Sequence, residues 1–292
     1  MPTPRQIRAR IRTAKNIQQI TKALKMVAAA KLRRAQESVG AARPYAAKIR
    51  EVMDSLGGMS ESGMSHPLLR QTSGEPRNIG IILISGDRGL AGAYNSGVIK
   101  KALELVRPYS TDRVRMICLG KRGIQFFKRR GYKVVAEHNV PPNGLPFADT
   151  QAISRVAREL FENQEIDALY LVYTRFVSAI SQKPESVQVL PLNPESAQSS
   201  GAPAGPTKEY IFEPGPDEIL SVLLPRYVDT LVYQAVLESV ASFHGAQMTS
   251  MSSATDNAGK MISSLTLQLN RARQATITKE IAEIVGGAEA LK

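Results

Sequence analysis

The sequence has few of the residues on which secreted, metal-dependent and membrane-spanning proteins depend. Its 292 residues include one cysteine, so an intramolecular disulfide is excluded and the fold does not rely on an oxidising compartment. The three histidines, His66, His138 and His244, are scattered without metal-ligand spacing, and we expect no metal site. The amino end lacks an apolar signal core, and no apolar run approaches the roughly 20 residues of a membrane helix. Any membrane association is therefore expected to go through partners.

Aromatic residues are also scarce. There is no tryptophan, and phenylalanine, tyrosine and tryptophan together make up 5% of the chain. This composition favours helical packing built on Ala, Ile, Leu and Val over an all-β sandwich. The single cysteine, Cys118, lies in the apolar stretch "VRMICLG", which predicts a buried strand residue rather than a nucleophile.

Acidic residues are nearly missing from the first fifty positions. This segment has thirteen Lys and Arg residues against one acid, Glu37, and so accounts for the whole formal net charge of +12. Like charges three or four residues apart on a helix each cost about 0.2 to 0.5 kcal/mol. Glu37 can offset only part of this cost, through Arg33 or Arg34. An acidic surface facing the segment would turn the cost into attraction, which favours an anionic partner.

Apolar residues recur at three- and four-residue steps from Pro4 to about Leu56, with one glycine, Gly40, on the way. The spacing predicts one long helix. The stripe contains many alanines, which would let a second helix approach closely, and consists of Ile7, Ile11, Ala14, Ile17, Thr21, Leu24, Ala28, Leu32, Ala35, Val39, Ala42, Ala46, Ile49, Met53 and Leu56.

A second helical pattern begins with Pro225 at a first-turn position and runs to about Val285. Neither helix could expose its apolar stripe to water alone, so we expect the two chain ends to form an antiparallel pair. The carboxyl-terminal helix should be the longer of the two. Its last turns, "EIAEIVGGAEAL", would then project past the other helix with apolar side chains and no partner from this chain.

The segment between the helices alternates between strand and helix patterns. Strands are expected at 79–85, 114–120, 133–138, 167–178 and 186–192, and helices near 96–106, 122–130 and 149–163. This order predicts a mostly parallel sheet with helices on its faces, and the short link between the last two strands predicts an antiparallel hairpin at one edge. The predicted domains are 1–56, 78–213 with a flexible insertion at 193–208, and 217–292.

The stretch "ISGDRGLAGAYNSG" has glycines three residues apart, at Gly86, Gly89 and Gly92, and resembles a phosphate-binding turn. It lacks the lysine and hydroxyl of a P-loop, because Leu90 and Ala91 follow Gly89. It also departs from the G-x-G-x-x-G spacing of a dinucleotide site. The alternative is a tight strand-to-helix turn in which Asp87 and Arg88 form local hydrogen bonds.

No catalytic set emerges from the other residues, because there is no G-x-S-x-G elbow and the histidines stand apart from any acid and serine. We therefore expect neither catalytic residues nor a cofactor. Nucleic acid is one candidate for the anionic partner, but the basic helix has no interleaved aromatics. A protein with acidic loops is the other.

Two end segments resemble the γ subunits of F-type ATP synthases. "NIQQITKALKMVAAAKLRRAQ" (16–36) is similar to the family's amino-terminal helix, and residues 252–291, which include "NRARQATITKEIAEIVGG", are similar to its carboxyl-terminal signature. "GDRGLAGAYN" (86–95) also resembles a loop of the family's α/β domain. The resemblance implies a long antiparallel coiled coil of the terminal helices with an inserted Rossmann-like α/β domain, of the bacterial type without the chloroplast redox insertion.

The resemblance further implies a non-catalytic rotor shaft that couples proton flow to ATP synthesis or hydrolysis. Its partners would be the hexamer of α and β subunits, the ε subunit and the ring of c subunits, and its place the cytoplasmic face of the bacterial cell membrane. It implies no cofactor and no nucleic acid.

The resemblance also assigns residues to three contact groups. Contacts to β subunits are expected from Arg271, Arg273, Gln274 and Thr278, with Lys22, Leu24 and Lys25 in the corresponding zone of the opposing helix. An apolar bearing at the tip is expected from Ile281, Ile284 and Val285. A loop on the side of ε and the c ring is expected from Asp87, Arg88 and Asn95.

The chain departs from the family's pattern at several positions. Leu24 stands where methionine is usual, Ala91 where cysteine is common, and "SFHGAQM" (242–248) where the family has "SEHAARM". Phe243 and Gln247 thus replace charged residues, and Gly245 should cost about 1 kcal/mol of helix stability. The two-cysteine insertion is absent, so no redox control is expected.

Overall fold

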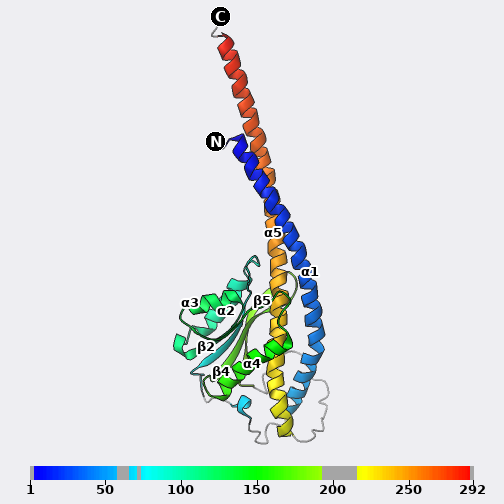
Figure 1. Cartoon of the computed structure of the whole chain (residues 1–292), viewed down its shortest axis with the longest axis vertical. Coiled ribbons are helices and arrows are strands. Elements are labelled where there is room, and N and C mark those ends of the chain that lie inside the picture. The colour runs from blue at the N-terminus through cyan, green and yellow to red at the C-terminus, as the bar shows by residue number, and fades with distance from the viewer. Residues whose placement is uncertain (1–2, 58–65, 71–73, 193–215, 290–292) are drawn as a thin grey trace. The chain divides into compact units, whose positions relative to one another are not determined.

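The computed structural model describes residues 3–57, 66–70, 74–192 and 216–289 (Figure 1). The chain divides into two compact units, each of which contains parts of both terminal helices. Unit 1 comprises Met1–Ala28 and Gln247–Lys292, and unit 2 comprises Ala29–Ala246. The expected insertion at 193–208 lies outside the described residues.

Two long helices run through both units. Helix α1 spans Pro4–Gly57 and contains Pro44, which has no N–H to donate to the carbonyl of Gly40. Helix α5 spans Pro216–Glu289. The expectation that Pro225 opens this helix was wrong, because the helix begins nine residues earlier and Pro225 lies inside it.

A five-stranded sheet forms the centre of unit 2. Its strands are β1 (Ile79–Ile84), β2 (Val114–Leu119), β3 (Lys133–His138), β4 (Ala168–Phe176) and β5 (Gln182–Leu190). The spatial order is β3-β2-β1-β4-β5, and all neighbouring pairs are parallel except the antiparallel pair β4 and β5. The predicted parallel sheet with an edge hairpin is confirmed, with β5 starting within the link expected to precede it.

Residues of β1 alternate between two apolar clusters. Ile79, Ile81 and Leu83 pack against α2 (Tyr94–Val106) and α3 (Lys121–Arg129). Ile82 and Ile84 belong to the cluster that includes α4 (Phe147–Glu162), α5 and the short 3-10 helix η2 (Pro67–Leu69). A second 3-10 turn, η3 (Thr111–Arg113), leads into β2. Both faces of the sheet are thus covered by helices, which explains why all six residues of β1 are buried.

Cys118 lies in β2 and is fully buried, as predicted. Burial raises the pKa of its thiol to about 12, because the thiolate would lose its hydration. The residue therefore contributes to packing and is chemically inert at neutral pH.

Within unit 1, α1 and α5 pair in antiparallel orientation. Thr21 Oγ1 accepts a hydrogen bond from Thr255 Oγ1 at 2.8 Å, and Lys25 Nζ donates to Ser252 Oγ at 3.0 Å, so numbers rise along one helix as they fall along the other. The side of α1 that faces α5 steps alternately by four and three residues, as in a coiled coil. Its positions are Ile7, Ile11, Ala14, Gln18, Thr21, Lys25 and Ala28.

The expected stripe was wrong at Ile17, which is 49% exposed. Gln18 takes its place because Gly259 of α5 lies opposite. A Cβ on Gly259 would lie 3.1 Å from Gln18 Nε2, so the missing side chain makes room for the glutamine. Polar residues of α1 thus face α5 in this stretch, which the apolar spacing of α1 alone does not predict.

Candidate functional site

The carboxyl-terminal part of α5 presents its polar candidates to solvent. Arg271, Arg273, Gln274 and Thr278 are all exposed. Thr278 Oγ1 donates to the carbonyl of Gln274 at 2.9 Å, so that hydroxyl is held against its own helix. The two guanidinium groups take part in no ion pair within the described residues, which leaves them available to an external carboxylate.

The candidates on α1 differ from one another. Lys22 is exposed and Leu24 is partly buried. Lys25 is exposed, but its ammonium donates to Ser252 and so is turned toward α5. Thr278, Arg273 and the α1 candidates all belong to unit 1.

The candidates on α1 do not lie opposite the candidates near Arg271 on α5. Lys25 lies opposite Ser252, which precedes Arg271 by nineteen residues on α5. At 1.5 Å per residue this is roughly 28 Å along the helix. The expectation that Lys22, Leu24 and Lys25 occupy the zone opposite the Arg271 group was therefore wrong. The antiparallel register places that group near the beginning of α1 instead.

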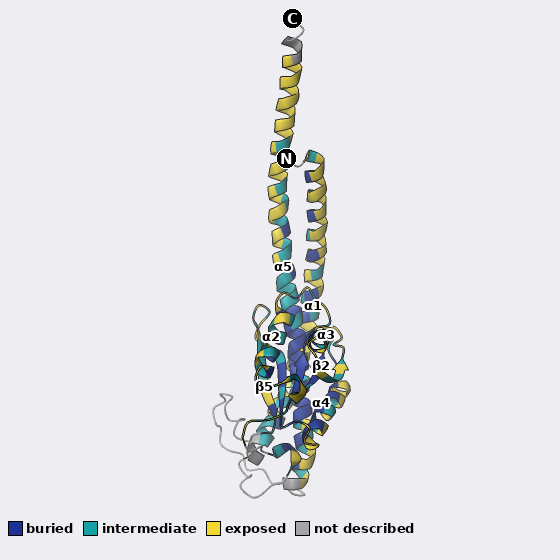
Figure 2. Cartoon of the chain, turned by 90° about the vertical axis from the view of Figure 1, so that its left-hand side faces the viewer, coloured by how far each residue is buried: buried dark blue, intermediate teal, exposed yellow. Residues whose placement is uncertain are grey.

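The last turns of α5 have no partner from α1. The register that pairs Lys25 with Ser252 brings the first residue of α1, Pro4, opposite position 273, and Figure 1 shows the amino end of α1 beside α5, well short of its carboxyl end. Ile281, Ile284 and Val285 lie beyond this point and are 56%, 72% and 60% exposed. Figure 2 shows this segment as continuously exposed. Such a run of apolar side chains in water marks a contact surface.

Unit 1 also carries an excess of positive over negative charge. Its described residues include eleven Lys and Arg against four Asp and Glu, and none of the acids lies on α1. Exposed apolar residues, Ile17, Ile20, Met26 and Val27, lie among the charges on α1. A cationic surface with apolar side chains fits a protein partner with acidic residues better than it fits water.

The glycine loop lies in unit 2 and is internally closed. Gly86 N donates to Asn95 Oδ1 at 2.8 Å, and Asn95 Nδ2 donates to the carbonyl of Arg88 at 3.0 Å. The ring of Phe243 from α5 covers Gly86, since a Cβ there would lie 2.9 Å from Phe243 Cε2. The backbone amide that would hold a phosphate is thus used, and an aromatic ring lies against the glycine. The reading of this loop as a tight turn is supported, and the phosphate reading is not.

Asp87 does not form the local hydrogen bonds that were expected. Its Oδ1 accepts from the backbone N–H of Lys121 at 2.9 Å and of Val140 at 3.3 Å. These residues follow β2 and β3, so one carboxylate ties together the loops at the carboxyl ends of three adjacent strands. The third loop candidate, Arg88, is exposed. Among the described residues, its guanidinium forms neither a hydrogen bond nor an ion pair.

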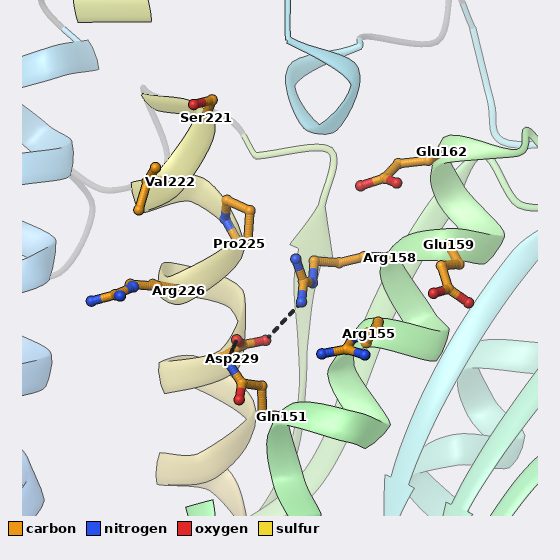
Figure 3. Close-up of a pocket in the computed structure, with 10 residues that line it drawn as sticks. All are labelled: Gln151, Arg155, Arg158, Glu159, Glu162, Ser221, Val222, Pro225, Arg226 and Asp229. Atoms are coloured by element: carbon orange, nitrogen blue, oxygen red, sulfur yellow. Dashed lines mark hydrogen bonds and ion pairs between the residues drawn. The ribbon is translucent and has the colours of Figure 1, made fainter. Parts of the chain in front are cut away.

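A buried carboxylate that sequence reasoning missed joins α4 to α5. Asp229 of α5 is 1% exposed and accepts hydrogen bonds from Ser154 Oγ and from Gln151 Nε2, the latter at 3.2 Å. Arg158 Nη2 lies 3.4 Å from its Oδ1. Figure 3 shows Arg158 reaching from α4 toward Asp229 beside a cleft of about 400 Å³. The signal in the sequence was an aspartate directly after Val228 in an apolar helical stripe.

A second buried acid, Glu238 of α5, lies against the sheet. Its Oε1 accepts from Gln234 Nε2 at 3.2 Å, whereas its Oε2 is buried without a hydrogen-bond partner. Burial raises the pKa of this carboxyl, and the nearby Glu185 acts in the same direction. Tyr173 donates to Glu185 at 2.7 Å, and burial together with this bond raises the pKa of its phenol.

The described residues contain no group of three His, Cys, Asp or Glu that could hold a metal ion. Within the same part of the chain, no helix has an apolar stretch long enough to cross a membrane.

Comparison with known proteins decides the family. A family model described as ATP synthase matches residues 3–291. The ATP synthase gamma chain of Heliobacterium modesticaldum is 47% identical over 294 residues, with all of both chains covered. The chain belongs to the ATP synthase γ-chain family. The γ chain of Brevibacillus brevis is likewise 47% identical, with 98% of each chain covered.

Solved structures agree with the fold. A chain of the Euglena gracilis mitochondrial ATP synthase has a TM-score of 0.64 at 17% identity, covering 99% of this chain and 94% of that one. A chain of the central stalk and c-ring structure from Tetrahymena thermophila has a TM-score of 0.61 at 24% identity, covering 80% and 99%. The predicted γ-family fold, terminal helices around an inserted α/β domain, is confirmed.

Proposed function

We propose that the chain is the central rotor shaft of an F-type proton-translocating ATP synthase. The observation that carries this proposal is the end of α5, where Ile281, Ile284 and Val285 are exposed beyond the first residue of α1. A single apolar helix end beside a cationic helix pair suits a rod that enters a protein bearing. Membership in the γ-chain family supports the same function.

In this function the shaft is a non-catalytic subunit. The partners are the hexamer of α and β subunits, the ε subunit and the ring of c subunits. Proton flow through the ring turns the shaft, and its asymmetric surface drives the β-subunit sites in turn through binding, synthesis and release. The chain would be peripheral to the membrane complex, at the cytoplasmic face of a bacterial cell membrane.

The polar candidates of unit 1 would contact β subunits. Arg271 and Arg273 can form charge-assisted hydrogen bonds with carboxylates on β-subunit loops. Gln274, Thr278, Lys22 and Leu24 would add contacts at two levels of the helix pair. Lys25 is the weakest member of this group, because its ammonium donates to Ser252 within the pair.

The loop after β1 would face ε and the c ring. Asp87 and Asn95 serve the loop itself through their bonds to backbone groups, so direct contact falls to Arg88. Asp87 and Asn95 therefore stabilise the loop, and Arg88 is the residue that can contact a partner.

The contact proposal is tested by Arg273→Ala in the complete complex. Loss of one charge-assisted contact of about 1.5 to 3 kcal/mol should lower coupled ATP turnover, while subunit assembly stays intact. The matched control is Arg129→Ala, an exposed arginine on α3 in unit 2. Unchanged turnover in Arg273→Ala, or an equal loss in both variants, would reject the assignment.

The rotor proposal itself is tested by the subunit composition of the assembled complex. Co-expression with α and β subunits should yield one copy of this chain per hexamer, and failure to form such a complex would contradict the proposal. A basic nucleic-acid-binding coiled coil would instead bind duplex DNA with a steep dependence on salt.

A further inference from the structure

One turn of α5 contacts the α/β domain through four consecutive residues. Its four consecutive residues, Ser242, Phe243, His244 and Gly245, each contact a different segment of unit 2. Ser242 Oγ donates to the carbonyl of Thr174 in β4 at 3.0 Å. His244 Nε2 lies 2.8 Å from the carbonyl oxygen of Pro142, in the connection between β3 and α4. We call this turn, Ser242–Gly245, the collar.

The two remaining contacts of the collar use glycines. Phe243 lies against Gly86, in the loop after β1, and its ring meets the edge of Tyr94 with centroids 5.4 Å apart. On another side of the helix, Gly245 faces the turn between β4 and β5. A Cβ on Gly245 would lie 3.2 Å from the carbonyl oxygen of Ala179 and 3.1 Å from Gln182 Nε2. A Cβ on Gly86 would force the Phe243 ring to move, whereas a Cβ on Gly245 would be tight but would need the turn to shift by only a few tenths of an ångström.

The four contacts leave the helix in different directions because of its geometry. Successive residues of an α-helix point about 100° apart, so four of them cover almost the full circumference. Burial agrees, because Ser242, His244 and Gly245 are buried and Phe243 is partly buried. The described residues of α5 after this turn are mostly half-buried at first and then exposed. The collar is therefore the last turn of α5 in unit 2 that is mostly buried.

We propose that the collar is the attachment through which torque passes between the α/β domain and α5. This inference rests on the proposed rotor function. Flat apolar packing resists separation of two elements but only weakly resists sliding or rotation of one against the other. A ring set against Gly86 and polar contacts in several directions fix the helix against both movements.

The attachment nearer the amino end of α5 is one-sided. Asp229 is bound by three side chains, all from α4, and so it holds α5 to a single neighbouring helix. The collar instead joins α5 to β4, to the loop after β1, to the connection before α4 and to the β4–β5 turn. Its loss should separate the domain from the helix in rotation without unfolding either.

The test uses Phe243→Ala in the complete complex, with ATP hydrolysis and ATP-driven proton pumping measured in the same vesicles. Hydrolysis should persist while protons pumped per ATP fall several-fold, because the helix slips inside the domain. Amide exchange at 242–245 should accelerate about tenfold or more, as the turn opens more often. The matched control is Phe147→Ala, which removes a ring that packs on Tyr233 of the same helix, outside the collar.

A disulfide supplies the second arm of the test. With Gly245→Cys and Ala179→Cys, the new Cβ on residue 245 would lie 3.7 Å from Ala179 Cα, so the two cysteines are near enough for a disulfide to be tried between them. Oxidation should leave coupling intact in the otherwise unmodified chain and restore it in Phe243→Ala. Reduction should reverse the rescue.

The possible outcomes separate the two proposals. If the unmodified complex pumps protons but Phe243→Ala pumps equally well, or loses no more pumping than Phe147→Ala, the collar proposal is overturned and the rotor function stands. If the disulfide stops coupling in the unmodified chain, the turn and the helix must move relative to one another, and the collar proposal again fails. If the chain without substitutions forms no coupled complex, the rotor function itself fails.

Discussion

Helix α5 has two different environments along one uninterrupted element. In unit 2, residues 235–242 are all buried, although they include Glu238, Ser239 and Ser242. In unit 1, residues 273–286 are all exposed, although they include Ile277, Ile281 and Ile284. The helix thus buries some polar groups at one end and exposes some apolar side chains at the other. The buried polar groups hold the first segment in specific directions, and the exposed apolar side chains of the second can be buried only by another molecule.

The largest expected effect comes from the buried acid of unit 2. Asp229→Ala leaves Arg158 without its partner in a mostly buried position, and it should lower the free energy of unfolding by about 3 to 5 kcal/mol. Asp256→Ala, an exposed acid of α5 in unit 1, should change it by less than about 0.5 kcal/mol. Urea unfolding of the two variants measures both values. A similar loss in both would break the contrast between the units.

Glu238 makes the contrast depend on pH. Its pKa is raised in the folded chain, so the folded state binds more protons than the unfolded state between the ordinary carboxyl pKa and the raised one. The stability contributed by this group is therefore highest in acid and falls as pH rises through that window. Around it lie Glu185, Tyr173 and Arg175 of the sheet and Gln234 of its own helix.

Glu238→Gln should remove this decline and, at neutral pH, raise the free energy of unfolding by about 1 kcal/mol, because a carboxylate charge that burial disfavours is lost. Unfolding by urea across the range from acid to neutral pH measures the slope for both proteins. A decline of the same slope in Glu238→Gln would assign the titration to another group.

A smaller effect is expected within the helix pair of unit 1. Thr255→Val removes the bond to Thr21 Oγ1 and should cost about 1 kcal/mol, seen as amide exchange at residues 18–25 that is several-fold faster. Thr276→Val is the control, since its hydroxyl bonds only to its own helix, at the carbonyl of Ala272. The double variant of Thr21 and Thr255 should be less than additive. Full additivity would show that the two hydroxyls act independently.

The smallest effect on stability is expected at the end of α5. Ile284→Ser should change the free energy of unfolding of the isolated chain by no more than about 0.5 kcal/mol, because the side chain is already exposed. In the complete complex the same change should lower coupled turnover. Val222→Ser, at an exposed apolar residue of unit 2, serves as the control. A marked loss of stability in Ile284→Ser would mean that this chain itself buries the side chain.

Much of the fold could be predicted because its signals are periodic. The two helices follow from repeated apolar spacing, and the sheet follows from short apolar runs between helical ones. The starting point of α5 was misplaced because Pro225 was read as a beginning, whereas the helix continues through it. Ile17 was misplaced because the pattern of one helix does not show that Gly259 on the partner helix makes room for Gln18 instead.

The candidate site was predictable in part. Exposed basic and apolar residues near the chain ends are visible in the sequence, although the register that separates Lys25 from Arg271 is not. The collar could not be predicted from the sequence, because Phe243 contacts Gly86 and Gly245 contacts Ala179, and these partners lie far away in the chain. The glycine that looked costly for helix stability is the one that lets the β4–β5 turn approach.

The burial of Cys118 has a practical consequence for the chemistry of the whole molecule. Because burial raises the pKa of the thiol to about 12, the thiolate is scarcely populated at neutral pH, and the residue is fully buried in β2. Maleimides and other electrophiles should therefore not react with Cys118 in the folded chain. A cysteine placed anywhere on the shaft would accept a fluorophore alone, so single rotating particles could be tagged without first removing the native one.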